Sequence, residues 1–379
     1  MRLSALWPKG LLLVLFTGLS LGALWRLYSV PLHQGSEIVL GQSCALSGPS
    51  AELGRGMRVG ANAWFAHVNA LGGIQGRTVK LITLDDRYEP RLSEANTRKL
   101  IEEYGVFALF GYVGTPTSQA VLPLVEQHKI PFVAPLTGAT LLREPPHPYV
   151  VNLRPGYEAE IDLLARYLRS LGLTRVAVFY QNDSYGKTGL FAARSVFERH
   201  RIQLVAEGAY TRNTLSVGHA LYEIAPHEPQ AVIMIDAYKP GAEFIRQARK
   251  RGLENALFAH VSFVNSDSLA AELGEAGMRN VLVAQVVPPA WEMNTPRVNE
   301  YREIMARYYP DEPLSFASLE GFLTAQSVTE GLENSIDRLT REGFLEALRA
   351  IQKKRRSELG VWITRYENGR MRPVEGWGP

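Results

Sequence analysis

The sequence predicts an α/β protein with two doubly wound parallel-sheet lobes. Short apolar runs with strand character alternate with longer segments in which apolar residues recur three and four positions apart. The short runs have no polar face, which is typical of strands that are buried on both sides of a parallel sheet. The alternation stops at the proline-rich segment 143–148 and then begins again. We therefore expect two lobes of similar construction.

Length and composition agree with this interpretation. The chain has 379 residues, of which 46% are hydrophobic and 21% are charged, as expected for a packed globular protein of two or three domains. The formal charge of +3 comes from Arg2, Lys9 and Arg26, which lie in an N-terminal stretch without acids. Without these three, the 41 basic residues fall to 38 and equal the acids in number. A neutral body gives no electrostatic footprint for nucleic acid, so we expect no nucleic-acid partner.

The first 30 residues predict export. Arg2 and Lys9 form a basic front, and an apolar run follows at residues 11–25. This run is shorter than the ~20 residues that span a bilayer comfortably. Residues 1–30 are expected to be either a cleaved signal peptide or an N-terminal membrane anchor. The rest of the chain is expected to be periplasmic, free in the first case and tethered to the inner membrane by residues 11–25 in the second. The only cysteine, Cys44, lies well past the run and cannot form an intrachain disulfide.

The first half of the chain contains strand–turn–helix units. The first unit is a strand at 37–44, a turn at Ser47-Gly48-Pro49 and a helix from about residue 54. We expect further strands at 78–84, 106–112 and 129–135, and helices at 90–104 and after the turn 114–118. The glycines at 54, 56 and 60 resemble a dinucleotide fingerprint, but the third is one position late, and close helix packing explains them better.

The second half repeats the pattern and ends in a hairpin. Helices are expected at 158–171, 297–309, 319–332 and 341–351, with another from the turn 182–186 to residue 197. Strands are expected at 175–180, 203–210, 231–235, 257–261 and 281–287. The alternating segment 361–374 contains Asn368-Gly369, the strongest short signal for a type I′ hairpin turn.

No motif for catalysis or metal binding is present. The eight histidines show no pair at i, i+4 spacing, and the chain has no second cysteine to complete a zinc site. There is no nucleophile elbow and no phosphate-binding loop. We therefore expect a protein that is not an enzyme, with no catalytic residue, no metal and no cofactor.

Polar and aromatic residues do recur where predicted strands run into helices. In the first half these are Ser47, Thr115, Thr117, Ser118 and Thr137, and in the second half Tyr157, Asn182, Asp183, Tyr185, Tyr238 and Ser262. Ligands collect at the carboxyl ends of strands in open α/β sheets, where free helix N-termini offer N–H donors. Each hydroxyl taken alone is better explained as a helix cap. Their recurrence at one topological position favours ligand recognition.

Several motifs, taken in order, resemble a known family. They are Leu46-Ser47-Gly48-Pro49, Asp85-Asp86, Phe110-Gly111-Tyr112 to Gln119, Pro135-Leu136-Thr137-Gly138-Ala139, Phe179 to Gly186, and Ser318-Leu319-Glu320-Gly321. Over residues 36–375 the chain resembles the type I periplasmic substrate-binding proteins of ABC transporters, in the leucine/isoleucine/valine-binding group. The resemblance implies two lobes, joined by hinge crossovers, that close on a ligand. Lobe 1 would comprise residues 36–149 and 286–355, and lobe 2 residues 150–285 and 356–379. It also implies a small-molecule ligand, an ABC permease as partner and a monomeric protein.

The resemblance also suggests site residues. Thr115 matches a hydroxyl that holds an amino-acid carboxylate, Leu136 matches a backbone contact, and Tyr185 and Tyr238 match aromatic positions of the second lobe. The family's second threonine falls at Gly138, beside Thr137. The candidate ligand-binding residues are Ser47, Asp86, Thr115, Thr117, Ser118, Leu136, Thr137, Gly138, Tyr157, Asp183, Tyr185, Tyr238, Ser262 and Phe263.

One departure from the family bears on the ligand. The acidic residue that would pair with an α-ammonium group is Ser262 in this chain. A buried ammonium group without a carboxylate partner is costly. We therefore expect a ligand other than a plain zwitterionic amino acid, unless Asp183, Asp236 or Asp86 replaces the missing acid.

A second hypothesis assigns the same two-lobed fold a role other than delivery to a permease. The ambiguous N-terminal segment and the apolar cleft candidates Leu136, Phe263, Val264 and Trp291 also fit a membrane-anchored sensor or a periplasmic carrier of lipids or other apolar ligands.

Overall fold

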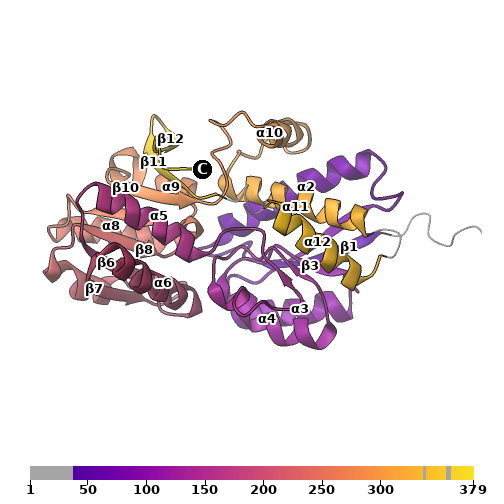
Figure 1. Cartoon of the computed structure of the whole chain (residues 1–379), viewed down its shortest axis with the longest axis horizontal. Helices are drawn as coiled ribbons and strands as arrows, with labels where there is room; N and C mark the ends of the chain where they lie inside the picture. Colours follow the sequence, from indigo (N-terminus) through magenta and orange to yellow (C-terminus); the bar gives the residue numbers. More distant parts are fainter. Residues whose placement is uncertain (1–36, 336–338, 356–359) are drawn as a thin grey trace, which may run out of the picture.

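Two α/β lobes, each with its own sheet, make up the protein (Figure 1). The computed structural model describes residues 37–335, 339–355 and 360–379, so the expected export segment 1–30 lies outside them. Within these ranges, no helix combines the length and the apolar character that crossing a membrane requires. The predicted α/β class with two parallel-sheet lobes is confirmed.

The first sheet contains five parallel strands in the order β2-β1-β3-β4-β5. Its strands are β1 (Ile38–Cys44), β2 (Val79–Asp85), β3 (Ala108–Phe110), β4 (Phe132–Val133) and β5 (Val150–Val151). The sequence did not predict β5, because two residues after a proline-rich segment are too few to show periodicity. β5 pairs with β4 and forms the edge of this sheet.

The second sheet contains seven strands in the order β12-β11-β10-β9-β8-β6-β7. Its strands are β6 (Arg175–Gln181), β7 (Gln203–Tyr210), β8 (Ala231–Ile235), β9 (Leu257–His260), β10 (Val281–Gln285), β11 (Trp362–Glu367) and β12 (Arg370–Pro373). Every residue of β8 and β10 is buried, as their unbroken apolar sequences predict. β11 and β12 form an antiparallel hairpin at the edge. Asn368 and Gly369 both have positive φ, at 51° and 83°, which confirms the predicted turn.

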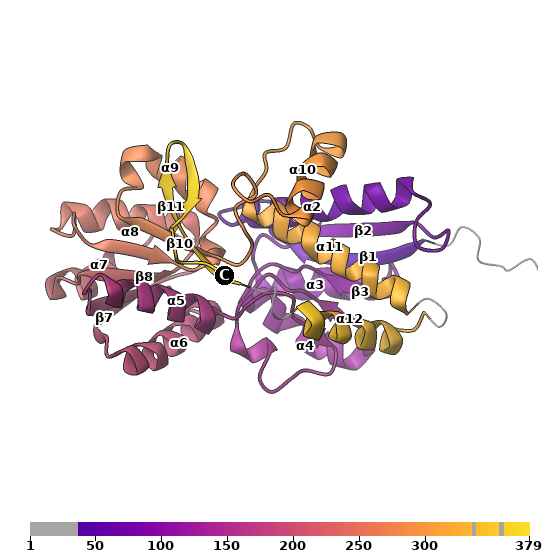
Figure 2. The same cartoon turned by 45° about the horizontal axis from the view of Figure 1, so that its top comes forward.

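Helices cover both sheets (Figures 1 and 2). The α-helices are α2 (Ala51–Ala70), α3 (Pro90–Glu102), α4 (Thr115–His128), α5 (Tyr157–Ser170), α6 (Ser184–His200), α7 (Gly218–Ile224), α8 (Tyr238–Lys250), α9 (Ser266–Gly277), α10 (Pro296–Tyr308), α11 (Phe316–Asn334) and α12 (Arg341–Arg355). Short 3₁₀ turns are η1 (Thr140–Leu142), η2 (Ala225–His227) and η3 (Ser262–Val264). A capping box between Ser315 and Ser318 begins α11.

α11 lies directly against α2, although the two helices are far apart in sequence (Figure 2). Glycines make this close approach possible. A Cβ at Gly60 would lie 1.8 Å from the carbonyl oxygen of Ser318, and one at Gly321 would lie 2.2 Å from the carbonyl oxygen of Met57. Of the glycines that resembled a nucleotide fingerprint, Gly56 and Gly60 thus allow α2 to pack on α11, and Gly54 allows α2 to pack on the Ala45 backbone after β1.

The chain passes between the lobes more than once. It leaves the first sheet after β5, completes β6 to β10 in the second, and returns to pack α10 and α11 on α2. It then supplies β11 and β12 to the second sheet. The residue limits of the two lobes given above stay a prediction.

Candidate ligand-binding site

The carboxyl ends of strands from both sheets meet between the lobes. Tyr88, which follows β2 in lobe 1, packs its ring against Phe263 of lobe 2, with ring centroids 5.6 Å apart. The side-chain amide of Gln181, at the end of β6, donates a hydrogen bond to the Tyr88 hydroxyl at 3.2 Å. This is the topological position at which open α/β sheets bind ligands.

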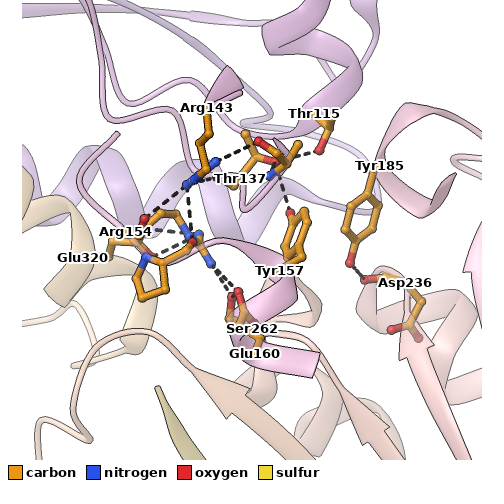
Figure 3. A network of polar contacts seen from close by, with 12 residues as sticks. Thr115, Thr137, Arg143, Arg154, Tyr157, Glu160, Tyr185, Asp236, Ser262 and Glu320 are labelled. Atoms are coloured by element: carbon orange, nitrogen blue, oxygen red, sulfur yellow. Dashed lines mark hydrogen bonds and ion pairs between the residues drawn. The ribbon is translucent and has the colours of Figure 1, made fainter. Parts of the chain in front are cut away.

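Buried aromatic rings occupy much of this interface. The ring of Tyr185 lies 4.6 Å from that of Phe263 and 5.4 Å from that of Tyr157. The Tyr185 hydroxyl donates to the backbone carbonyl of Asp236 at 3.2 Å (Figure 3). Burial raises the pKa of both Tyr157 and Tyr185 above the usual value, so both phenols are neutral.

The first-lobe hydroxyls are already engaged with protein atoms. Thr115 Oγ1 and Thr137 Oγ1 are hydrogen-bonded at 2.7 Å, and Thr137 also donates to the Tyr157 hydroxyl at 3.3 Å (Figure 3). Thr117 bonds back to the Val113 carbonyl at 2.5 Å.

Two neighbours of these hydroxyls complete this part of lobe 1. Ser118 Oγ is buried and has no hydrogen-bond partner among the described residues. Gly138 lies where any side chain would collide with Tyr157, since a Cβ would be 2.5 Å from its backbone nitrogen.

At the first-lobe lip, two acids lie at the end of β2, Asp85 as its last residue and Asp86 directly after it. Ser47 donates to the Asp85 carboxylate at 2.5 Å. Asp86 accepts from Ser43 Oγ at 2.8 Å and from the Tyr88 backbone N–H at 2.9 Å, and burial raises its pKa to about 7. Asp86 is therefore a weak candidate for a permanently charged partner of a ligand cation.

The second-lobe acids are also paired. Asp183 caps α6 by accepting a hydrogen bond from the Tyr185 N–H at 3.0 Å, and its other oxygen accepts one from the Arg212 guanidinium at 3.0 Å. Asp236 pairs with His260 at 2.9 Å, and both side chains are fully buried. Asp236 Oδ2 has no hydrogen-bond partner among the described residues, but it is enclosed, since a Cβ at Gly241 would lie 1.9 Å from it. Asp183 is therefore engaged on both oxygens, and the open oxygen of Asp236 lies against the backbone of its own lobe.

Tyr238, at the start of α8, is only partly buried. Burial raises its pKa, and the charges of Glu52 and Arg55 on α2 also act on it.

A buried ion-pair network surrounds Ser262 (Figure 3). Its backbone N–H donates to Glu160 Oε2 at 2.7 Å and its hydroxyl to Glu160 Oε1 at 3.1 Å. Arg154 contacts Ser262 Oγ and lies 3.5 Å from Glu160 and 3.2 Å from Glu320. Burial disfavours the Arg154 charge, but Glu320 and Glu160 outweigh it and raise the pKa of this arginine.

A small cavity of about 20 Å³ remains between the lobes, beside this network. Its lining residues are Leu53, Leu136, Arg154, Ser262, Asn265, Ser266, Asp267, Gln285, Val286, Val287, Phe316, Ala317 and Glu320. Of the residues predicted from sequence, only Leu136 and Ser262 are in this lining. The space holds about one water molecule.

Sequence reasoning missed most of this lining. Gln285 is the last residue of β10, so the rule that ligands collect at strand ends identifies it when applied to that strand. Asp267 and Phe316 lie in the first turns of α9 and α11, where no strand directly precedes the helix. Their position depends on the packing of distant segments. Within the described ranges, no group of three or more histidine, cysteine, aspartate or glutamate side chains is placed to hold a metal ion.

Comparison with known proteins agrees with this architecture. A family model described as periplasmic binding protein matches residues 37–372. A solved structure of a possible leucine/isoleucine/valine-binding protein from Rhodopirellula baltica is 33% identical, has a TM-score of 0.84, and the match covers 92% of this chain and 98% of the other. A substrate-binding periplasmic protein from Ralstonia solanacearum is 28% identical with a TM-score of 0.81, over 89% of this chain and 100% of the other.

A sequence relative is more distant. An amino acid binding protein from Pseudomonas aeruginosa is 22% identical over 243 residues, which are 64% of this chain and 65% of that protein. The chain thus spans less than two thirds of this relative. The family model, in contrast, covers both sheets and the interface between them. The chain belongs to the periplasmic binding protein family, as a type I substrate-binding protein similar to the leucine/isoleucine/valine-binding group.

Proposed function

We propose that this protein is an extracytoplasmic solute-binding protein that captures a small organic ligand between its lobes and delivers it to an ABC permease in the inner membrane. The ligand is something other than a plain zwitterionic amino acid. The protein acts as a monomer in the periplasm, either free or tethered to the inner membrane by residues 11–25. Family membership and the meeting of strand ends between the lobes support this role.

One observation carries the statement about the ligand: the positions that would hold the two charged groups of an amino acid are occupied by protein contacts. The hydroxyls of Thr115 and Thr137, expected at the carboxylate, bond to each other. Ser262 stands where the family has the acid that pairs with the ammonium group. Its N–H donates to Glu160, and Glu160 also forms an ion pair with Arg154.

The other acids considered for the ammonium group are no better placed. Asp183 and Asp236 are paired with Arg212 and His260. Asp86 has a pKa of about 7, because burial favours its neutral form. An ammonium group beside Asp183 or Asp86 would have to displace an existing partner or ionise a buried acid. One beside Asp236 Oδ2, which has no partner among the described residues, would need space that Gly241 takes up.

Binding requires the lobes to separate and close again. The cavity holds about one water molecule, so a larger ligand enters only when the interface opens. Tyr88 and Phe263 come from different lobes and would part in that movement. Hinge closure of this kind is the common mechanism of two-lobed binding proteins.

The experiment is to identify the ligand that accompanies the protein when it is purified from its native source, by mass spectrometry of the denatured sample. Because the relatives above carry amino-acid names, leucine, isoleucine and valine are the first compounds to titrate by calorimetry. We expect no tight binding of these three. Tight binding of leucine that Thr115→Ala abolishes would overturn the proposal. A thermal-shift screen then extends the search, since ligand at a hundred times its Kd stabilises by about 2.7 kcal/mol.

A further inference from the structure

Asp267 is the acid of the cavity lining that has no partner. It lies in the first turn of α9 and lines the space between the lobes together with Leu136 and Ser262. Among the described residues, no hydrogen bond or ion pair involves its carboxylate. The residue keeps some contact with solvent, but desolvation by the surrounding protein raises its pKa to about 6, and no neighbouring cation counteracts this effect. A carboxylate in this state gains most from a cation brought by a ligand.

The arginines near the cavity do not neutralise Asp267, because they are already close to other carboxylates. Arg154 lies between Glu160 and Glu320, and the charges of both acids also act on Arg143. Two guanidinium groups and two carboxylates thus form a balanced set.

Asp267 also borders a second, open hollow of about 520 Å³. Trp291, Leu314 and Tyr366 supply apolar surface to it. Arg370 lines the same hollow, but it forms no ion pair with Asp267. The carboxylate therefore lies between an inner cavity and an outer apolar wall, where a ligand with one polar end and an apolar body finds complementary surfaces.

We propose that Asp267 binds a positively charged nitrogen of the ligand, and that the ligand is a small amine with an apolar body. This rests on the proposed function and names the class of its ligand. The nitrogen is not next to a carboxylate, because Thr115 and Thr137 are engaged with each other and do not line the cavity. Phe316 and Leu53 of lobe 1 then contact the apolar part from the inner side.

A purely structural role for Asp267 makes different predictions. An acid in the first turn of a helix stabilises the helix through its dipole, whatever ligand is bound. Loss of that role would weaken all ligands alike, or lower stability without ligand. Selectivity among ligands of one shape therefore separates the two roles.

The test uses four probes with the same branched skeleton: isopentylamine, isovaleramide, isovalerate and leucine. Each is titrated by calorimetry into the purified chain and into Asp267→Asn. We expect isopentylamine to bind, and Asp267→Asn to weaken its binding by roughly thirtyfold, the loss that follows removal of one partner of a buried charge pair. The affinity for isovaleramide should differ little between the parent chain and Asp267→Asn, because this probe carries no charge. Glu275→Gln, which removes an exposed acid of the same helix, should leave all four affinities unchanged.

Asp267→Glu keeps the charge and should retain the preference for the amine, which guards against misfolding of Asp267→Asn. Failure of isopentylamine to bind, or an equal loss for all probes in Asp267→Asn, would overturn the role of Asp267. If isovalerate or isovaleramide binds while the amine does not, the proposed function stands and this inference falls. If the native protein carries no ligand and no probe binds, both fall.

Discussion

The guanidinium of Arg154 lies 3.2 Å from the carboxylate of Glu320. Arg154 is in the segment that connects the two sheets, and Glu320 is on α11, which packs on lobe 1. The same guanidinium reaches Glu160 on α5, which packs against α6 in lobe 2. One buried cation is therefore shared by acids from both sides of the hinge.

Removing this cation should be strongly destabilising. Arg154→Met leaves Glu160 and Glu320 buried without a cation between them, and we expect the free energy of unfolding to fall by about 3–5 kcal/mol. Urea denaturation measures the loss. Arg98→Gln, which breaks exposed pairs with Glu94 and Glu102, is the matched control and should stay within roughly 0.5 kcal/mol of the parent. Equal effects of the two substitutions would contradict this role of Arg154.

The outer edge of the lobe interface should contribute less. Glu89 of lobe 1 accepts from Arg212 at 3.0 Å and from Asn213 at 2.6 Å, both in the second lobe. Because the Glu89 side chain is partly exposed, we expect Glu89→Ala to weaken binding of the native ligand by at most about fivefold, through faster dissociation. Surface plasmon resonance measures the rates. Glu94→Ala, in α3, which begins directly after Glu89, is the control and should leave both rates unchanged. If Glu89→Ala slows association instead, Glu89 does not act by holding the lobes closed.

Close packing of α2 on α11 should depend on Gly60. A Cβ at this position meets the Ser318 carbonyl at 1.8 Å, so Gly60→Ala must push the helices apart. We expect a net loss of about 2 kcal/mol or more, because overpacking exceeds the gain of ~1 kcal/mol in helix propensity. Gly218→Ala in α7, where a Cβ meets nothing within 4 Å, should be neutral or slightly stabilising. Thermal unfolding of the two variants compares them directly.

Stability should fall as pH rises from about 4 to about 7, in part because of Asp86. Its pKa is raised to about 7 by burial, while in the unfolded chain it is about 3.9. Between these values the folded protein binds the proton and the unfolded chain does not, so raising the pH favours unfolding. Asp86→Asn should flatten this part of the stability profile. Asp311→Asn, at an exposed loop position, should not. An unchanged profile in Asp86→Asn would show that Asp86 is ionised in the folded protein.

The sequence was a good guide to the fold because its signals are local. The apolar runs at β8 and β10 have no polar face, and both strands are fully buried. The Asn368-Gly369 turn forms as expected, since the two residues tolerate the required positive φ. β5 was missed because a strand of two residues is defined by its partner β4 rather than by its own pattern.

The site was harder to predict because it is defined by packing between distant segments. Thr115 and Thr137 lie at strand ends as expected, but their hydroxyls satisfy each other. Asp267 and Phe316 come from helix starts almost fifty residues apart and line one cavity only because these two distant segments pack together. No periodicity or short motif in the sequence encodes that juxtaposition.

The packing of α2 on α11 also sets an order of assembly. Strands β6 to β10 are contiguous in sequence, so their sheet can form as soon as residue 285 is available. The glycine face of α2 has no partner until residues 316–334 follow. Since domains fold as units and distant contacts form slowly, lobe 2 should become protected from hydrogen exchange before lobe 1 does. The helix that follows β1 thus waits for residues 316–334, whereas five of the seven strands of the second sheet are available by residue 285.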